Sequence, residues 1–405
     1  MGAAGWSQTK GTAVIDASEL YHLDDMLTDD ERAVRDRVRD FCRTEVLPIA
    51  NDHWERGAYP RDLLPKFADL GIAGGTTEGY GCAGLSPVAN GLVSLELARA
   101  DGSVCTLFGV HSGLAMGTIA MLGSDEQKQR WLPAMAGMER IGAFALTEPD
   151  HGSDVVALET RARRDGDEWV LDGQKRWIGN GSEADVIVVW ARDDDDNVGG
   201  FVVDHPEGGR LDGFSSSVIT GKTGNRAVWQ ANLQFDGVRI PADHRLVHAE
   251  TFADTSTFLA HSRQGVAWEA LGHAEAAYAY SLEYALDRKQ FGRPIAGFQL
   301  IQDKLARMLA EITSMRLLCM RLAELQAQAK DSLAVSSLAK LHTASGARRV
   351  CQDARDLMGG NGLLLEYQVA RHLADVEATY TYEGTDTVQA LIVGREITGL
   401  QAFAN

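Results

Sequence analysis

The sequence predicts a mainly α-helical protein with a central β unit: an N-terminal α-helical domain, a middle β-barrel-like domain and a C-terminal α-helical bundle. Helical apolar spacing fills the first third of the chain, and short β-type runs broken by turns fill residues 142–241. The helical spacing then returns and continues to the end. We therefore expect a tail over residues 1–27, helices over 28–140, the β domain over 141–248 and the bundle over 249–405.

Capping signals mark the N-terminal helices. Thr28 and Glu31 have the spacing of a capping box, as do Ser124 and Gln127. One apolar face continues from Thr28 to about residue 56. Further helical patterns cover residues 63–70, 88–100 and 107–121. These segments predict a helical domain that ends before the first β-type run.

Alternating or continuous apolar runs separated by turn residues mark the β unit. The runs cover residues 158–163, 169–171, 186–190, 201–204 and 228–235. Pro241 marks the end of this region, because proline interrupts regular structure. Two long helical patterns follow, near residues 257–290 and 297–328. The order is therefore helices, a β unit, and helices again.

Composition limits the class of function. The chain has 405 residues, a net charge of −18, and 45% hydrophobic residues. This acidity argues against a nucleic acid partner, which requires clustered Lys and Arg. We also expect no membrane partner, because no apolar run approaches the roughly 20 residues that span a bilayer. Five cysteines without a CxxC pair predict a reducing, cytoplasmic location. The acidic residues 193–196 are interpreted as a solvated hairpin loop, so no metal site is expected.

Gly79, Gly81 and Gly84 have the spacing of the dinucleotide-binding fingerprint GxGxxG. That fingerprint functions only between a buried strand and the start of a helix. A helical pattern and a glycine-rich stretch precede it here. We therefore expect a loop, not a nicotinamide site.

Four short motifs carry candidate chemistry. They are Leu-Thr-Glu-Pro-Asp-His-Gly-Ser-Asp at 146–154, Gly-Gln-Lys-Arg-Trp-Ile-Gly-Asn at 173–180, Arg-Lys-Gln-Phe-Gly-Arg-Pro-Ile at 288–295 and Asp-Leu-Met-Gly-Gly-Asn-Gly at 356–362. Each has an ordinary structural explanation when taken alone: a loop, a core tryptophan, a charged helix end and a helix C-cap. Their joint occurrence needs another explanation.

Glu383 is the most informative single residue. It lies in Tyr382-Glu383-Gly384-Thr385, directly ahead of an amphipathic helical run. A lone glutamate in a first helical turn is usually explained by the helix dipole. Here residues 380–403 and the four motifs, in this order, resemble the acyl-CoA dehydrogenases over most of residues 90–403. The resemblance implies an FAD-dependent enzyme in which Glu383 removes a proton next to an acyl-CoA thioester.

The resemblance also assigns the other site residues. Cofactor contacts are implied for Phe144, Leu146, Thr147, Ser153, Trp177, Ile178, Gly179, Arg288, Gln290, Phe291, Gln299, Asp356, Gly359, Gly360, Thr385 and Thr387. Substrate contacts are implied for Cys105, Ser153, Arg263, Tyr382 and Gly384. In the family, the segment that matches the third motif reaches the FAD of a neighbouring subunit. The resemblance therefore implies a homo-oligomer, expected to be a tetramer.

Some relatives place the base on the first long helix of the last domain. The matching stretch here is Ala260-His261-Ser262-Arg263, and Ser262 cannot act as a base. Glu383 is then the sole candidate. Burial against apolar walls is expected to raise its pKa toward the working pH.

Two departures from the family pattern bear on the reaction. Gly179 stands where many members have a threonine whose hydroxyl bonds the flavin, and we expect glycine to leave more room beside the ring. Plant short-chain acyl-CoA oxidases have a similar Trp-Ile-Gly-Asn segment. Cys105 stands where glutaryl-CoA dehydrogenases, which this chain otherwise resembles, have an arginine for the distal carboxylate. The expected substrate is therefore a monocarboxylic, short or branched acyl-CoA.

Three classes of function remain open on the sequence. An acyl-CoA dehydrogenase that passes electrons to an electron-transfer flavoprotein is the first. An oxidase that passes them to oxygen is the second. A non-enzymatic acyl-CoA or acyl-carrier binding protein is the third, and the intact Glu383 and cofactor motifs count against it.

Overall fold

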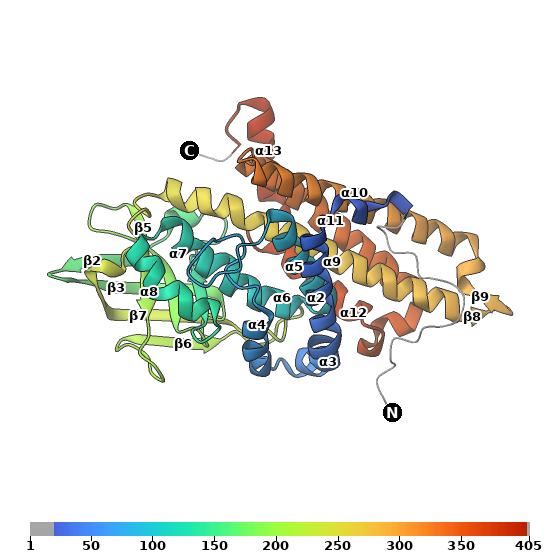
Figure 1. The fold of residues 1–405 in the computed structure, drawn as a ribbon, viewed down its shortest axis with the longest axis horizontal. Helices are drawn as coiled ribbons and strands as arrows, with labels where there is room; N and C mark the ends of the chain where they lie inside the picture. The colour runs from blue at the N-terminus through green and yellow to red at the C-terminus, as the bar shows by residue number, and fades with distance from the viewer. Residues whose placement is uncertain (1–19, 403–405) are drawn as a thin grey trace.

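A computed structural model describes residues 20–402. The molecule is elongated, with the sheet at one end, the N-terminal helices across the middle and the long helices of the bundle reaching the other end (Figure 1). The predicted fold class is confirmed: helices, then a sheet, then helices. The three parts meet around two apolar cores, and helices α5(Pro87–Ala100) and α9(Phe252–Asp287) contribute buried residues to both.

The N-terminal part is almost entirely helical. Its elements are η1(Leu23–Met26), α2(Asp29–Phe41), η2(Cys42–Val46), α3(Leu47–Arg56), η3(Arg61–Leu63), α4(Leu64–Leu70), α5, α6(Gly102–Phe108), η4(Gly109–Met116), α7(Gly117–Leu122) and α8(Asp125–Ala136). Both expected capping boxes are present, at Thr28 with Glu31 and at Ser124 with Gln127. The described part of the segment expected as a tail contains η1, where Leu23 is buried.

Helix α5 is buried on nearly all sides because it lies between the two cores. Leu92 and Leu95 pack with the C-terminal bundle, whereas Val93 and Leu97 pack with the N-terminal helices. A helix that is apolar around its circumference is stable only in such a position. It therefore fixes the N-terminal part against the bundle.

One expectation about apolar segments was wrong. Residues Gly102–Leu122 form a continuous helical segment, α6–η4–α7, of 21 residues that is long and apolar enough to cross a membrane. More than half of it is buried inside the molecule, where η4 packs against the first strand. Its middle, η4, is π-helical, an irregularity that often occurs beside functional sites.

The middle part is a curled, half-barrel sheet of seven strands. They are β1(Gly142–Ala145), β2(Arg161–Asp165), β3(Glu168–Gly179), β4(Val186–Arg192), β5(Val198–Asp204), β6(Phe214–Val218) and β7(Gln230–Pro241), with 3₁₀ turns η5(Val155–Ala157) and η6(Ala242–His244). The order is β1-β4-β2-β3-β7-β6, with β5 paired to β4. The β3–β7 register shifts between Lys175 and Ile178, where Trp177 has a φ of 64°. A bulge of this kind redirects the side chain that it contains.

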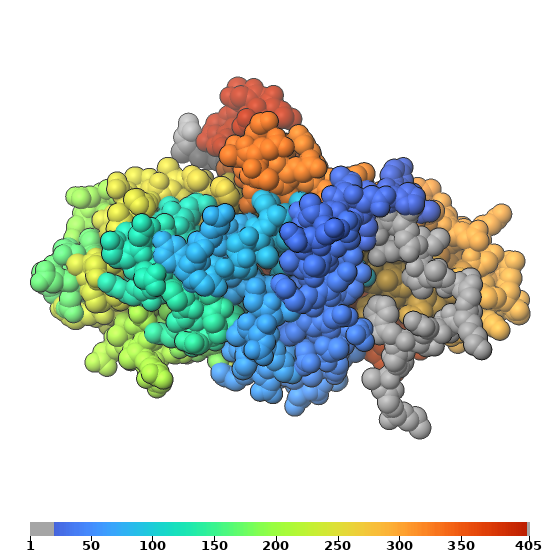
Figure 2. Space-filling view, in the orientation of Figure 1, coloured from blue at the N-terminus to red at the C-terminus, as the bar shows by residue number. Residues whose placement is uncertain are grey.

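The C-terminal part is a bundle of long helices. Its elements are α9(Phe252–Asp287), β8(Lys289–Gln290), β9(Arg293–Pro294), η7(Ile295–Gly297), α10(Gln299–Ala327), α11(Leu333–Leu357), η8(Gly359–Leu363), η9(Leu365–Tyr367), α12(Val369–Thr381) and α13(Asp386–Thr398). Helix α9 packs on α5, α10, α11 and α12. The small β8–β9 hairpin lies at the end of the molecule remote from the main sheet (Figure 1). Helix α13 stands out from the surface (Figure 2).

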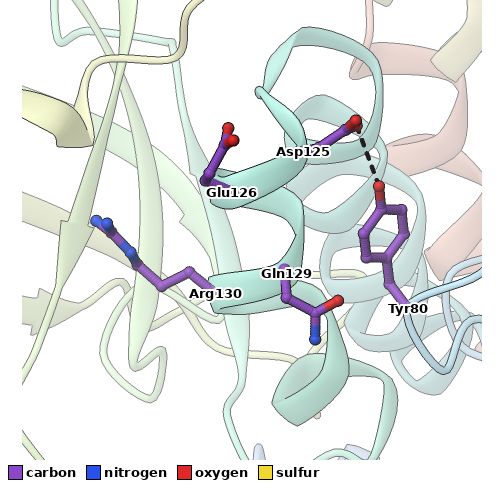
Figure 3. Close-up of a pocket in the computed structure, with 5 residues that line it drawn as sticks. All are labelled: Tyr80, Asp125, Glu126, Gln129 and Arg130. Atoms are coloured by element: carbon purple, nitrogen blue, oxygen red, sulfur yellow. Dashed lines mark hydrogen bonds between the residues drawn. The ribbon is translucent and has the colours of Figure 1, made fainter.

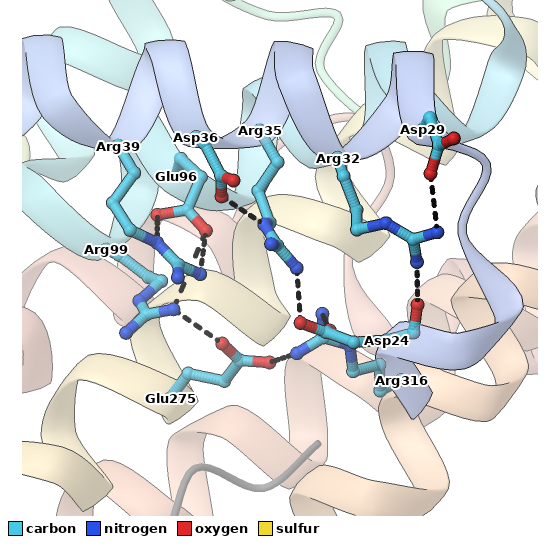
Figure 4. Close-up of polar contacts among 10 residues, drawn as sticks. All are labelled: Asp24, Asp29, Arg32, Arg35, Asp36, Arg39, Glu96, Arg99, Glu275 and Arg316. Carbon is cyan, nitrogen blue, oxygen red and sulfur yellow. Dashed lines mark hydrogen bonds and ion pairs between the residues drawn. The ribbon is translucent and has the colours of Figure 1, made fainter. Parts of the chain in front are cut away.

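A network of ion pairs joins α2 and η1 to α5, α9 and α10 (Figure 4). Its buried members are Arg35, Glu96, Glu275 and Arg316. Glu96 accepts from Arg39 at 2.7 Å, and Arg316 pairs with Glu275 at 3.1 Å and with Asp24 at 3.2 Å. Buried charges are tolerated only when they are paired. The network therefore fixes how the N-terminal helices seat on the bundle.

The glycine-rich stretch after α4 is a loop, as predicted. Gly79, Gly81 and Gly84 all have positive φ, a conformation that favours glycine. Tyr80 of this loop hydrogen-bonds Asp125 of α8 at 3.2 Å across a shallow surface hollow, with Gln129 and Arg130 beside it (Figure 3). The hollow is open to solvent, and its residues anchor the loop to α8.

Candidate active site

A cavity of about 1140 Å³ lies where the three parts of the molecule meet. Its walls come from α5, α6 and η4 on one side, from β1 and β3 on another, and from α9, α12 and the turn before α13 on the third. Single drug-sized ligands occupy roughly 300–1,000 Å³. The cavity therefore has room for more than one small ligand group.

Glu383 lies on the turn between α12 and α13 and lines this cavity. Its φ is 52° and that of Gly384 is 88°, so the turn passes twice through the left-handed region. The Ser262 hydroxyl of α9 donates to the Glu383 carboxylate at 2.8 Å. The Glu383 carbonyl accepts from Arg263 at 3.2 Å and from Gln389 at 2.9 Å. A non-glycine residue at positive φ is strained, and these contacts hold it there.

Lys340 of α11 supports the same turn from below. It is buried, and its Nζ donates to the carbonyl oxygens of Tyr382 and Gly384, on either side of Glu383. The sequence did not predict the contact of Lys340 with this turn or the hydrogen bond between Ser262 and Glu383. A lone lysine inside a helical pattern gives no signal, because only the fold brings it to a turn some 40 residues later.

The pKa of the Glu383 carboxyl lies above its ordinary value. Burial is the main cause, since it penalises the charged form. The Ser262 hydrogen bond and the charges of Lys340 and Arg263 lower the pKa and oppose this shift. A carboxylate held in this way can act as a base, because burial raises its proton affinity and its neighbours lower it only in part.

A second carboxyl, Glu269 of α9, also lines the cavity and was not singled out from the sequence. Tyr382 donates to it from its hydroxyl at 2.5 Å, and Thr379 donates at 3.3 Å. Cys105 of α6 lines the same region, as predicted, and its thiol lies 3.4 Å from the Ser94 carbonyl oxygen. Burial raises the pKa of the Cys105 thiol well above its ordinary value, so the residue is neutral.

The opposite wall is made by the ends of β1 and β3. The lining residues here that the sequence analysis assigned to the cofactor are Phe144, Leu146, Thr147, Ser153, Trp177, Ile178 and Gly179. A buried ion pair fixes the end of β1, because Lys175 contacts Glu148 at 2.9 Å and the Leu146 carbonyl at 3.0 Å. Asn180, fully buried, ties the end of β3 to α6 and β1 through the Leu107 and Gly142 carbonyls.

The expectation of extra room at Gly179 needs correction. A Cβ at this position would lie 2.8 Å from a side-chain carbon of Val110. Val110 belongs to the π-helical segment η4, which therefore fills the space that a side chain at 179 would take. Glycine here permits close packing of η4 on β3.

The remaining predicted residues divide into two groups. Arg263, Tyr382, Gly384 and Thr385 line the cavity with Glu383. Arg288, Gln290, Phe291, Gln299, Asp356, Gly359, Gly360 and Thr387 do not line it. The β8–β9 hairpin and its flanks carry Arg288, Gln290, Phe291 and Gln299, at the end of the molecule remote from the main sheet (Figure 1). Within one chain the hairpin residues are not brought to the cavity.

Family models match nearly the whole chain. The acyl-CoA dehydrogenase N-terminal domain matches residues 28–139, the middle domain 143–238 and the C-terminal domain 252–398. The chain belongs to the acyl-CoA dehydrogenase family. It is accordingly an oxidoreductase, and acyl-CoA dehydrogenases use FAD.

Individual acyl-CoA dehydrogenases agree with this assignment. The chain is 36% identical over 373 residues to the mitochondrial short-chain specific acyl-CoA dehydrogenase of Bos taurus, covering 91% of this chain and 90% of the relative. A glutaryl-CoA dehydrogenase structure from Mycobacterium smegmatis superposes with a TM-score of 0.93 at 42% identity, covering 96% of this chain and all of the other. A second such structure from M. smegmatis, in complex with FADH2, has a TM-score of 0.93 at 37% identity and the same coverage.

FAD fits the wall formed by β1 and β3. Trp177, held at positive φ by the bulge, is 51% exposed and lines the cavity, which presents an aromatic surface suited to a flat ring. Thr147 and Ile178 flank it. Among the described lining residues the only Lys and Arg are Lys222 and Arg263, and both donate to carbonyl oxygens of this chain. The cavity wall therefore suits the ring but offers no uncommitted cation for a pyrophosphate.

Proposed function

We propose that this acyl-CoA dehydrogenase oxidises a short or branched acyl-CoA to the trans-enoyl-CoA, with Glu383 as the base. The observation that carries the proposal is the Glu383 turn: a carboxylate in a cavity, hydrogen-bonded by Ser262 and braced by Lys340 and Arg263. A base must be positioned before its pKa matters. This turn positions the carboxylate, and burial raises its pKa.

Glu383 takes the proton from the carbon next to the thioester carbonyl. The developing negative charge on the thioester oxygen needs hydrogen-bond donors. The Glu383 backbone N–H donates to no acceptor among residues 20–402, which leaves it for that oxygen. FAD, when bound, accepts the hydride from the next carbon of the acyl chain. Trp177 and Thr147 would hold the ring against the β1–β3 wall.

The acyl group in this proposal is monocarboxylic. Cys105 is neutral and Glu269 is a carboxyl, so this part of the cavity offers no cation for a distal carboxylate. Burying an unpaired carboxylate costs several kcal/mol. A monocarboxylic substrate agrees with the name of the short-chain relative of Bos taurus and not with that of the glutaryl-CoA dehydrogenase of M. smegmatis, although the latter resembles the chain in fold.

The cofactor site is proposed to be completed by a second copy of the chain, in a homotetramer. Arginine binds phosphate groups with two parallel hydrogen bonds, and Arg288 lies on an exposed hairpin with Phe291, which is 94% exposed. The cavity itself lacks an uncommitted cation, as described above. A partner's hairpin would supply the missing charge.

The electron acceptor is proposed to be an electron-transfer flavoprotein, with oxygen as the alternative because Gly179 departs from the usual threonine. An anaerobic titration of the FAD-loaded protein with butyryl-CoA and glutaryl-CoA, followed through flavin absorbance, tests the reaction. We expect bleaching by butyryl-CoA and little by glutaryl-CoA. Admitting air and assaying peroxide then separates the acceptors: rapid peroxide formation would identify an oxidase. Faster bleaching by glutaryl-CoA with release of carbon dioxide would overturn the proposed substrate class.

A further inference from the structure

Glu269 lies on the same face of α9 as Ser262, the hydrogen-bond partner of the base. Seven residues separate them, which is two helical turns or about 10.5 Å along the axis. Both side chains line the cavity. A substrate whose reacting carbon lies at Glu383 therefore has Glu269 further along the wall that its acyl chain follows.

Hydrogen bonds satisfy only one side of the Glu269 carboxyl. Tyr382 and Thr379 both donate to Oε1. No residue in the described part of the chain donates to Oε2, and no Lys or Arg there pairs with this carboxyl. The nearest imidazole, His273 at 4.0 Å, has a pKa lowered to about 3 by burial and is neutral. One oxygen of a buried acid is left with acceptor capacity.

The surroundings of Glu269 are acidic. Glu383 and Asp375 both raise its pKa, which burial brings to about 7, whereas Lys340, whose charge also interacts with Glu269, donates to the Tyr382 and Gly384 carbonyls. A hydrocarbon chain placed against such a group would bury an unsatisfied polar atom, which is unfavourable. A carboxylate placed there would add like-charge repulsion. Above pH 7, where the carboxyl is mainly ionised and can only accept, a hydrogen-bond donor is the chemistry that this position accommodates.

We propose that the preferred acyl group carries a hydrogen-bond donor, a hydroxyl or an ammonium group, near its end remote from the thioester, and that Glu269 accepts this hydrogen bond. The inference rests on the proposed function and narrows its substrate class. Glu269 is then a specificity-determining residue: it selects among acyl-CoA substrates and takes no part in proton removal. Sites built to bond a substrate donor discriminate strongly against analogues that lack it.

Binding to the FAD-loaded Glu383→Gln variant tests the inference without turnover. The probes are acyl-CoA thioesters of about four to six carbons, a range set by the ~10.5 Å spacing less the side-chain lengths. Each is compared as the plain, ω-hydroxy and ω-amino compound by isothermal titration calorimetry. We expect at least about a tenfold lower Kd for a donor-bearing chain than for the plain chain of equal length, as one charge-assisted hydrogen bond gives.

Added substitutions at position 269 assign the preference to the side chain. Glu269→Leu is expected to abolish the tighter binding of donor-bearing chains. Glu269→Gln is expected to keep the tighter binding of the hydroxyl compound and to lose that of the ammonium compound. Gln264→Leu is the matched control: Gln264 is buried on the same helix and bonds Asp331 at 2.9 Å, but it does not line the cavity. It is expected to leave the preference unchanged.

The outcomes separate the two proposals. Equal or tighter binding of plain chains at every length, or a preference that survives Glu269→Leu, overturns the role of Glu269 while butyryl-CoA still bleaches the wild-type flavin. Absence of both binding and bleaching with every thioester overturns the proposed function and this inference together. A preference for the hydroxyl alone or for the ammonium alone identifies which donor the site takes.

Discussion

Glu383 adopts a left-handed backbone conformation that costs a non-glycine residue of order 1–3 kcal/mol. Three side chains hold it there through backbone carbonyls: Lys340, Arg263 and Gln389. Glu383 lines the cavity, and its backbone N–H donates to no acceptor among residues 20–402. In the proposed reaction this one residue supplies both the base and a donor for the thioester oxygen.

Replacing Glu383 with glutamine is expected to abolish the reaction while sparing the fold. Glutamine keeps the size of the side chain and can still bond Ser262, so FAD and acyl-CoA binding should persist. The rate of flavin reduction should fall at least about a hundredfold, the lower end for loss of a positioned base. Stopped-flow absorbance under anaerobic conditions measures it. Reduction at near the wild-type rate would mean that another group removes the proton.

Removing the Ser262 hydroxyl should shift the pH dependence of the reaction. The hydrogen bond lowers the pKa of Glu383, so Ser262→Ala raises that pKa, and the base then ionises at higher pH. The acidic limb of the reduction rate should move up by about one unit, since a bond to a charged group contributes roughly 1.5 kcal/mol. Ser281→Ala, which removes a hydroxyl bonded at 2.9 Å to the Tyr278 carbonyl on the same helix, is the control. If the acidic limb of Ser262→Ala stayed at the wild-type pH, Ser262 would not be the group that lowers the pKa of Glu383.

Local sequence predicted the base but not its partners. Glu383 lies in a contiguous motif, so its neighbours along the chain identify it. Ser262 and Lys340 reach the turn from two other helices, α9 and α11, at separations of 121 and 42–44 residues. Such contacts depend on helix packing, which periodicity does not specify. The roles assigned to these residues stay predictions until the variants are measured.

At the scale of elements, the shape of the cavity depends on two local irregularities, the π-helical turns of η4 and the bulge in β3, which lie side by side. The π-helical η4 places Val110 against Gly179, and the β3 bulge redirects Trp177 beside it. Hydrophobic periodicity predicted the helix over residues 107–121 but a strand only over 169–171, whereas β3 continues to Gly179, because residues 172–176 carry no apolar side chain. Periodicity could not predict the π turns or the bulge, because each is a local change of register that depends on packing against a neighbouring element.

The link between α6 and α12 gives an element-scale prediction. Arg371, fully buried, contacts Asp101 at 2.7 Å, and Asp101 caps α6, which carries Cys105 into the cavity wall. Arg371→Met should destabilise the protein by about 3–5 kcal/mol, because it leaves a buried carboxylate without its cation. Thermal unfolding of the FAD-loaded proteins measures this loss.

The matched control for that change is an exposed ion pair elsewhere. Arg307 pairs with Asp303 at 2.9 Å on the surface of α10, and both side chains are more than half exposed. Arg307→Met should cost no more than about 1 kcal/mol. Equal effects of the two substitutions would show that burial of the Arg371–Asp101 pair does not determine its contribution.

For the whole molecule, the buried Glu269 couples stability to pH. Its folded pKa is about 7 against an ordinary 4.5, so its stabilising contribution is complete below about pH 4.5 and is lost as the pH rises through 7. Glu269→Gln lacks this dependence. The stability of the wild type relative to the variant should therefore fall by up to about 3 kcal/mol between pH 5 and 8, at 1.4 kcal/mol per pKa unit.

Asp375 titrates in the same range, with a pKa raised to about 7, and is present in both proteins, so the difference reports Glu269 together with its coupling to Asp375. Denaturant unfolding at pH 5, 6, 7 and 8 measures the difference directly. A constant difference across this range would mean that Glu269 stays ionised throughout, despite its burial beside Glu383.

The fold of the whole chain was predictable because helical and strand periodicities change cleanly along it. The completeness of the site was not, because the β8–β9 hairpin lies at the end of the molecule remote from the main sheet (Figure 1) and its residues do not line the cavity. No pattern within a sequence states that two distant segments meet between copies. The resemblance to a family supplied that expectation, and it is open to a direct test.

Mixed oligomers decide whether the cofactor site is shared. Arg288→Ala should prevent FAD binding, whereas Glu383→Gln should leave it intact but inactive, so each variant alone is inactive. If one chain's cavity is completed by its partner's hairpin, a mixed pair holds one site with both parts intact. Random pairing across a two-fold interface then restores about a quarter of the sites. Co-expression of the two variants at equal levels, followed by activity per chain relative to the wild type, measures this fraction. If each chain completed its own site, the cavity with an intact Glu383 would always carry the altered Arg288, and no mixture would recover activity.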